Sequence, residues 1–238
     1  MSSIFKSSRA NKRGLSLLLD RTLKSHHDMK VFGLGALSEF SLPSYQRFAC
    51  SRYHFYTALE RRFDAAPASS SIHRIWSTYQ ATLRQSPCLA SDLAEVSIPS
   101  PSSLPPCPST RRYVDDIESS SPDELVGHFY TRYFADLFGG SMLGAPTSLS
   151  LGVPPPSFYS FEGVTKDNRP AYIEGIYERL NESGEAMGEG GREAAVDATR
   201  RAFRWNADVI KEAGLLYLSE HAARGIVNVG SGYLRSKN

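Results

Sequence analysis

The stretch HFYTRYFADLFGG, residues 128–140, combines residue types that could do chemistry: a guanidinium, a carboxylate and two adjacent glycines among five phenylalanine and tyrosine rings. On an α-helix each residue turns by roughly 100° from the last, which places six residues on one face: Phe129, Arg132, Tyr133, Asp136, Gly139 and Gly140. A carboxylate on such a face can accept or donate protons toward a bound molecule. The missing side chains of the glycines could let a flat ligand lie against the helix backbone.

The glycine pair could also serve the helix itself. A glycine inside a helix costs about 1 kcal/mol relative to alanine, so two in succession need a reason. They could end the helix as a C-cap, with Asp136 in solvent, or admit the backbone of a neighbouring helix. Helix geometry alone favours these two structural roles over a ligand site, and it leaves all three open.

The elements that must position this stretch are helices. Apolar residues recur at about 3.6-residue spacing, and no useful β-alternation or internal repeat occurs. The start of the helix that carries 128–140 is well marked, because Ser121-Pro122-Asp123-Glu124 has the pattern of a capping box. We therefore predict an all-α fold, with helices over residues 15–32, 44–63, 72–84, 122 onward, 171–183 and 192–221.

The chain of 238 residues fits one domain, which we place at residues 15–222. Residues 1–14 are expected to be a flexible N-terminus or a targeting remnant, since this region is basic and contains no acid. Residues 85–121 are rich in serine and proline and predict a long surface connection, with a short helix only at SDLAEV. Residues 144–170 are predicted to be a loop, and residues 223–238 a C-terminal tail.

Composition limits the classes of partner. The net charge is +2 and no dense run of lysine and arginine occurs, so we expect no nucleic-acid partner. The three cysteines, Cys50, Cys88 and Cys107, form neither a disulfide framework nor a CxxC metal pattern. No segment approaches the roughly 20 consecutive apolar residues of a membrane helix. We expect a soluble protein of a reducing compartment, either plastid or cytoplasm.

The stretch 128–140 resembles the distal-helix signature of heme oxygenases, which is close to YTRYxxDLxGG. Eight positions match: Tyr130, Thr131, Arg132, Tyr133, Asp136, Leu137, Gly139 and Gly140. The resemblance implies a single-domain helical bundle that holds heme between a proximal and a distal helix.

The same resemblance implies a proximal iron ligand in the first helix. The family places a threonine four residues before that histidine, and Thr22 precedes His26 by four. His26 lies on the apolar stripe of the predicted helix, whereas His27 points roughly 100° away. We therefore predict that a neutral His26 binds the iron, with His27 as the alternative.

Other segments extend the resemblance. RYHFYTALE, residues 52–60, resembles the second-helix motif LYxxYxALE, which implies that Tyr56 belongs to a distal water network. Arg179 precedes Phe203 by 24 residues, as the propionate-binding arginine of the family does. A planar guanidinium can bind a carboxylate through two hydrogen bonds, and Tyr130 is expected to assist it. Phe203 and Asn206 are expected to line the pocket.

The activity that the resemblance implies is oxidative cleavage of heme to biliverdin, carbon monoxide and ferrous iron. Heme b would be both substrate and cofactor, with O2 as co-substrate. Asp136 would order water and deliver protons, with Arg132 and Tyr56 as partners, while Gly139 and Gly140 bring the backbone close. The sequence carries no flavin, nicotinamide or iron-sulfur motif, so we expect an external electron donor, a ferredoxin rather than a membrane-bound reductase. We expect a monomer.

Two other classes of protein compete with this hypothesis. A non-catalytic heme-binding or scaffolding protein could keep the fold, and Phe138, which replaces a small polar residue of the family, could crowd the distal side. A helical enzyme of thiaminase-like architecture would not explain TRYxxDLxGG. Retention of Asp136 and both glycines favours the enzyme.

Overall fold

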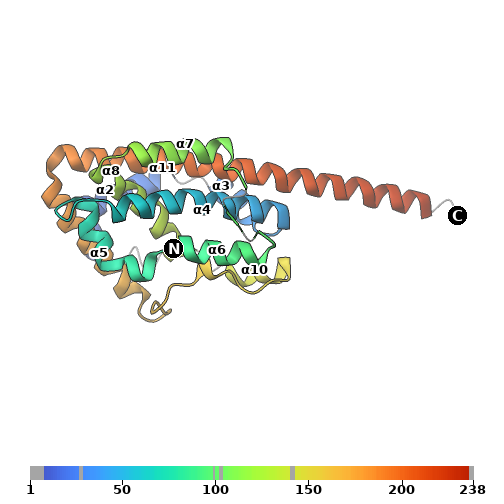
Figure 1. Ribbon diagram of the computed structural model, residues 1–238, viewed down its shortest axis with the longest axis horizontal. Helices are drawn as coiled ribbons and strands as arrows, with labels where there is room; N and C mark the ends of the chain where they lie inside the picture. The colour runs from blue at the N-terminus through green and yellow to red at the C-terminus, as the bar shows by residue number, and fades with distance from the viewer. Residues whose placement is uncertain (1–7, 27–28, 99, 102–103, 140–142, 236–238) are drawn as a thin grey trace.

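The structure is a computed structural model that describes residues 8–26, 29–98, 100–101, 104–139 and 143–235 (Figure 1). These residues form helices and connections and contain no strand, which confirms the all-α prediction. The helical elements are η1 (Ala10–Lys12), α2 (Gly14–His26), α3 (Met29–Ser38), α4 (Leu42–Asp64), α5 (Ser71–Leu83), α6 (Ser86–Glu95), α7 (Pro108–Ser119), α8 (Pro122–Phe129), η3 (Tyr130–Phe134), α9 (Ala135–Gly139), α10 (Gly144–Leu151), η5 (Ser157–Tyr159) and α11 (Arg169–Arg235).

The longest element, α11, packs against α2, α3, α4, α5, α7 and α8. The sequence predicts two helices here, and the structure confirms them, since α11 consists of two helical parts that meet at a kink at Gly188. This glycine has φ 72° and ψ −172°, a non-helical conformation almost restricted to glycine, and it interrupts the helix. Helix α11 continues through the expected tail to Arg235, and its C-terminal part projects beyond the bundle (Figure 1).

Of the two alternatives for residues 1–14, a flexible N-terminus or a targeting remnant, the structure contradicts flexibility for the part that begins at Ser8. Ser8, Ala10 and Asn11 are buried, because the segment is tied to α11. The carboxylate of Glu174 accepts hydrogen bonds from the backbone N–H groups of Arg9 and Ala10, at 3.0 and 2.9 Å. Backbone donors that would be solvated in a free terminus are satisfied here by one side chain.

The prediction of a long surface connection over residues 85–121 is wrong apart from the short helix expected at SDLAEV, which forms the C-terminal half of α6. Helices α6 and α7 lie in this range, and the apolar pairs Leu89/Leu93 and Tyr113/Ile117, each spaced by four residues, are buried. The prolines begin these helices instead of preventing them, because Pro87 and Pro108 occupy the first two positions, where a backbone donor is not needed.

The predicted loop at residues 144–170 contains α10 and the 3-10 helix η5. Asp92 of α6 holds η5 in place by accepting hydrogen bonds from the backbone N–H groups of Ser157 and Phe158, at 2.7 and 2.9 Å. The loop composition hid this element because its anchor lies 65 residues earlier in the chain.

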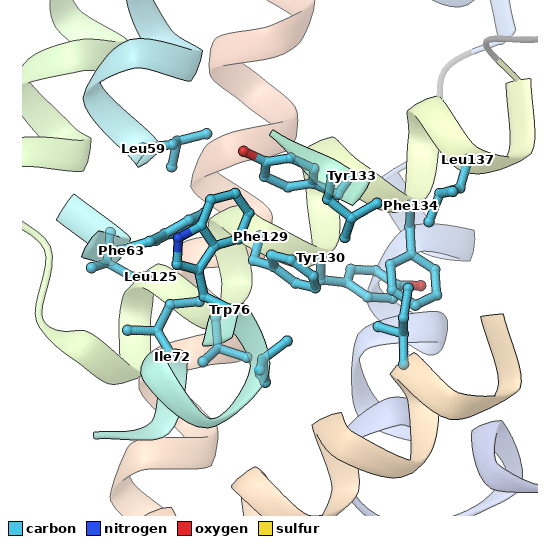
Figure 2. Close-up of a cluster of buried hydrophobic side chains, with 14 of the residues drawn as sticks. Leu59, Phe63, Ile72, Trp76, Leu125, Phe129, Tyr130, Tyr133, Phe134 and Leu137 are labelled. Atoms are coloured by element: carbon cyan, nitrogen blue, oxygen red, sulfur yellow. The ribbon is translucent and has the colours of Figure 1, made fainter. Parts of the chain in front are cut away.

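The helix start at Ser121 is confirmed. The Ser121 hydroxyl accepts from the Glu124 backbone N–H, and the Glu124 carboxylate accepts from the Ser121 backbone N–H at 2.8 Å. This capping box aims α8 into an aromatic core (Figure 2). In that core the Trp76 ring centroid lies 5.1 Å from Phe63 and 5.7 Å from Tyr133, and Phe129 stacks on Tyr133 at 5.1 Å.

Among the described residues, no helix is both long and apolar enough to cross a membrane.

Candidate functional site

The candidate site lies where α8 changes its winding. Residues Tyr130–Phe134 form a π-helix between α8 and α9, and all five are buried. A π-helical turn inserts an extra residue into the helix and occurs frequently at functional sites. The face predicted from a regular helix is thereby divided. Phe129 and Tyr133 enter the aromatic core, while Arg132 and Asp136 face residues of α4 and α11.

Four of the predicted site residues come together from four elements. The Tyr56 hydroxyl of α4 donates a hydrogen bond to the Asp136 carboxylate at the start of α9. The Arg132 guanidinium donates to the amide oxygen of Asn206 on α11. Arg132 also lies over the Phe55 ring, with its guanidinium carbon 4.5 Å from the ring centroid. The residues Arg132 and Asp136 of this stretch thus belong to a buried polar site, and Asp136, at 8% exposure, is not a solvent residue.

Burial and charge compete at the carboxylate. Removal from water raises the pKa of Asp136, and the positive charge of Arg132, the hydrogen bond from Tyr56 and the charge of Arg52 oppose that rise. Burial and the neighbouring carboxylate raise the pKa of Tyr56 well above its ordinary value of 10, so Tyr56 keeps its proton and remains the donor. A carboxylate whose pKa is raised by burial, and which is held by a hydrogen-bond donor, is suited to general acid–base chemistry.

Sequence reasoning missed Tyr113 of α7. Its side chain is fully buried, and the charges of Arg132 and Asp136 act on its hydroxyl. The Tyr113 hydroxyl and Nε of Arg132 have no hydrogen-bond partner within the described part of the chain. The available signal was the four-residue spacing of Tyr113 and Ile117, which the serine and proline around them obscured.

A second buried cluster surrounds Tyr130. Its hydroxyl donates to the Asp20 carboxylate of α2 at 2.5 Å, and the Tyr177 hydroxyl of α11 donates to the same oxygen at 3.0 Å. The Asn11 amide donates to the other carboxylate oxygen at 2.9 Å. Asp20 and Tyr177 were absent from the predicted site. An acid within the apolar sequence LLLDRTL was the signal for Asp20.

The structure does not bring Arg179 to Tyr130. Its guanidinium forms an ion pair with Glu182 at 2.8 Å, and 41% of its side chain is exposed. Arg179 follows Tyr177 by two residues, so helical geometry directs the two side chains to roughly opposite faces of α11. The charge of Arg179 instead acts on Tyr79 of α5. The spacing along the sequence therefore placed Arg179 on the right helix, but it did not predict the direction of its side chain.

The remaining predicted residues are described in part. Phe203 is half-buried on α11. Phe138 is partly buried, and its ring packs on Phe134 with centroids 5.8 Å apart. His26 is the last residue of α2 and Gly139 the last of α9. The side chain of His26, all of His27 and all of Gly140 lie outside the described residues.

The family model for heme oxygenase matches residues 15–212, a range that includes Tyr56, Arg132, Asp136 and Asn206. The chain belongs to the heme oxygenase family. Among curated relatives, this family member is 30% identical over 184 residues to the heme oxygenase of Takifugu rubripes, covering 73% of this chain and 63% of that protein. It is 26% identical over 201 residues to heme oxygenase 1 of Rattus norvegicus, covering 81% and 66%. The chain thus spans just under two thirds of the length of these relatives.

Solved heme oxygenases share the fold. The structure of heme oxygenase-2 from Synechocystis, in complex with heme and NO, aligns with a TM-score of 0.77 at 23% identity, over 88% of this chain and 90% of that one. Heme oxygenase from Leptospira interrogans aligns with a TM-score of 0.71 at 20% identity, over 84% and 100%. The predicted helical bundle of a heme oxygenase is therefore confirmed.

Proposed function

We propose that this family member cleaves heme to biliverdin, carbon monoxide and ferrous iron, with O2 as co-substrate. The observation that carries the proposal is the buried hydrogen bond from Tyr56 to Asp136, beside Arg132 on a π-helical turn. A purely structural helix end would leave the carboxylate in solvent. A non-catalytic heme-binding protein would have no need for a buried acid with an upward-shifted pKa, which is typical of sites that transfer protons.

Two buried polar groups of the site suit a heme with an oxygen ligand. The buried Tyr113 hydroxyl and Nε of Arg132 are donors with unmet hydrogen-bonding capacity, which suits small oxygen ligands and ordered water on a distal side. His26 ends the proximal helix α2 and would hold the iron through a neutral imidazole. Tyr130 would contact the heme edge, and Phe203 and Asn206 would line the pocket. When bound, heme supplies the iron that activates oxygen and the porphyrin ring that is opened.

The protein side chains would supply protons and orientation. Asp136 would hold and pass a proton at its carboxylate, through ordered water. Tyr56 fixes the direction of that carboxylate by donating to it, and Asn206 fixes Arg132 by accepting from it. Gly139 and Gly140, which lack side chains, would let the helix backbone approach the bound ring.

The proposed electron donor is a separate protein, a ferredoxin. The chemistry requires several electrons, and the sequence carries no motif for a flavin, nicotinamide or iron-sulfur cluster. We further propose that the enzyme acts as a monomer.

The test is to add hemin to the purified chain and then supply ferredoxin, its reductase and NADPH. We expect a Soret band of a histidine-ligated heme, followed by its loss and the appearance of the biliverdin band. The Asp136→Ala variant should bind hemin with unchanged affinity and yield at most a few per cent of the biliverdin. Asp115→Ala, which removes an exposed carboxylate on α7, is the control and should behave as the parent. A stable Soret band without bilin in the parent would favour the non-catalytic heme-binding protein.

The proximal ligand is tested separately. His26→Ala should abolish the spectrum of a histidine-ligated heme, and added imidazole should restore it by occupying the space of the missing ring. His27→Ala should leave the spectrum unchanged. The reverse pattern would move the iron ligand to His27.

A further inference from the structure

A buried ion pair lies close to the candidate site and has no part in the roles proposed above. Nη1 of Arg52 on α4 lies 2.8 Å from the carboxylate of Glu39, which directly follows α3. The two side chains are 9% and 0% exposed. Moving both charges out of water is so costly that such a pair adds little net stability. A role in the chemistry of the site would account for it better than fold stability does.

Arg52 is fixed in place from several sides. Its Nη1 donates to the Tyr159 hydroxyl of η5 at 2.9 Å. Its guanidinium carbon lies 4.0 Å from the centroid of the Phe48 ring and 4.7 Å from that of Phe158. Cation–π contacts of this kind hold a guanidinium in one position. Arg52 is therefore a stationary positive charge in a medium of low dielectric constant.

Arg52 is connected to the Asp136 site by its position on α4 and by ring contacts. Arg52 and Tyr56 are four residues apart on α4, so they occupy the same helix face. The Phe158 ring, which carries Arg52 on one side, contacts the Tyr56 ring with centroids 5.7 Å apart. Tyr56 in turn donates its hydrogen bond to Asp136. Through Phe158 and Tyr56, the packing of Arg52 thus helps to position the carboxylate of Asp136, and its positive charge lies near that carboxylate.

We propose that Arg52 is a positioning residue for the site: its buried charge favours the ionised carboxylate of Asp136 that accepts from Tyr56, and Glu39 opposes that effect. The proposal rests on the proposed role of Asp136 in heme cleavage. In agreement with it, the charge of Arg52 acts to lower the pKa of Asp136, and Asp136 acts to raise that of Glu39. The charged and titratable groups around Asp136 are Arg132 and Tyr133 of η3, Arg52 and Tyr56 of α4, Tyr113 of α7, and Glu39.

The test measures the pKa of Asp136 by NMR in the heme-free chain, with ¹³C-labelled aspartate and the resonance assigned through Asp136→Asn. Arg52→Met removes the cation and should raise this pKa by on the order of one unit. Glu39→Gln removes the opposing anion and should lower it. Shifts of opposite sign distinguish an electrostatic role from a general loss of packing, which would not depend on the sign of the charge removed.

Control variants keep the test decisive. Arg47→Met removes an exposed cation from the same helix and should leave the pKa of Asp136 unchanged, and Arg52→Lys should restore most of the shift. Arg52→Met leaves Glu39 buried without its partner, so it could fail to fold. The double variant Glu39→Gln/Arg52→Met removes both charges, and the pKa of Asp136 in it should lie between the values in the two single variants.

An unchanged pKa of Asp136 in Glu39→Gln and in the double variant, or shifts of one sign in both single variants, would overturn the role of Arg52. The titration needs no heme turnover, so it separates the two proposals. If the parent protein fails to form biliverdin while the variants show the predicted pKa shifts of Asp136, the proposed function is refuted and the electrostatic coupling stands.

Discussion

At the scale of single residues, burial acts on two titratable groups of the helical run 122–139 in the same physical way. It raises the pKa of Asp136 and lowers that of His128, because in each case it disfavours the charged form. The outcomes differ because their neighbours differ. Asp136 has two arginines and the Tyr56 hydroxyl nearby, whereas the carboxylate near His128, that of Asp116, also pairs with Arg201 at 3.0 Å.

The hydrogen bond from Tyr56 should be visible in the pH profile of turnover. If the ionised form of Asp136 is the active one, biliverdin formation falls as pH drops through its pKa, which burial places above the usual 3.8. Tyr56→Phe removes a donor that favours the ionised form, so the acid limb should move to higher pH by on the order of one unit. The measurement is initial rate against pH. A limb that stays in place or moves to lower pH would contradict the assignment.

His128 should make the fold sensitive to acid. Burial lowers the pKa of His128 to about 4 in the folded chain, against 6.5 when it is exposed. Between these two pH values the unfolded chain binds a proton at His128 and the folded chain does not. The free energy of unfolding therefore falls as the pH decreases from about 6.5 to 4, whereas above 6.5 the protonation of His128 does not reduce it. The loss should be roughly 3 kcal/mol, at about 1.4 kcal/mol per pKa unit.

Urea unfolding at several pH values measures this dependence. The matched variant is His128→Gln, which can still bond to Ser120, the residue whose hydroxyl lies 3.1 Å from the His128 ring. It should be less stable than the parent at pH 7 and show a flatter dependence between pH 4 and 6.5. An unaltered slope would assign the acid sensitivity to other groups.

At the scale of elements, the crossing of α8 and α11 depends on one glycine. A Cβ placed on Gly127 would lie 2.2 Å from the backbone oxygen of Ala195 and 2.8 Å from the backbone nitrogen of Thr199. The backbones of the two helices therefore approach more closely than any side chain allows. The Thr199 hydroxyl lies at the crossing, 2.9 Å from the Ala195 carbonyl oxygen and 3.3 Å from the Gly127 carbonyl oxygen. Because α8 leads directly into η3, this contact sets the depth at which Arg132 and Asp136 lie.

We expect Gly127→Ala to destabilise the fold by about 3 kcal/mol or more, since rigid backbone cannot yield to the added methyl group. Hemin binding should weaken with it, because the distal segment is displaced. Gly33→Ala is the control. A Cβ at Gly33 in α3 meets nothing within 4 Å, so helix propensity should stabilise this variant by about 0.5–1 kcal/mol. Equal stability of the two variants would refute the close crossing.

At the scale of the whole molecule, one continuous core joins α2, α4 and η3. Leu15 and Leu19 of α2, Phe55 of α4 and Tyr133 of η3 belong to a single buried cluster. The buried residues Val209 and Ile210 of α11 lie just before residue 212, where the family match ends. The C-terminal part of α11 projects from the bundle (Figure 1).

Removal of residues 222–238 should therefore change the free energy of unfolding by less than about 0.5 kcal/mol, as for surface changes in general. Hemin affinity should be unchanged. Removal of residues 203–238 is the contrasting truncation. It takes away the buried Val209 and Ile210 together with Asn206, the partner of Arg132, and should prevent stable folding. Calorimetry and hemin titration compare the two. A large loss of stability in the shorter truncation would show that the projecting helix packs on the body.

Local signals in the sequence were enough for the fold class, the helix start at Ser121 and the motif around Asp136. A capping box and a 3.6-residue period act over a few residues, so they can be recognised without knowledge of the tertiary structure. Such signals failed where composition imitated a loop. Prolines usually break helices, but in α6 and α7 they lie at the first positions, and the misleading composition concealed Tyr113.

Only the tertiary structure decided which polar groups meet. Asp136 accepts a hydrogen bond from Tyr56, which lies 80 residues earlier in the chain. Tyr130 of η3 and Tyr177 of α11 both donate to Asp20 of α2. Arg179 faces solvent while its neighbour by two positions faces the interior. The physical reason is that a buried charge or donor must find its partner wherever packing brings helices together. Those meetings depend on how whole helix faces fit, and no short stretch of sequence contains that information.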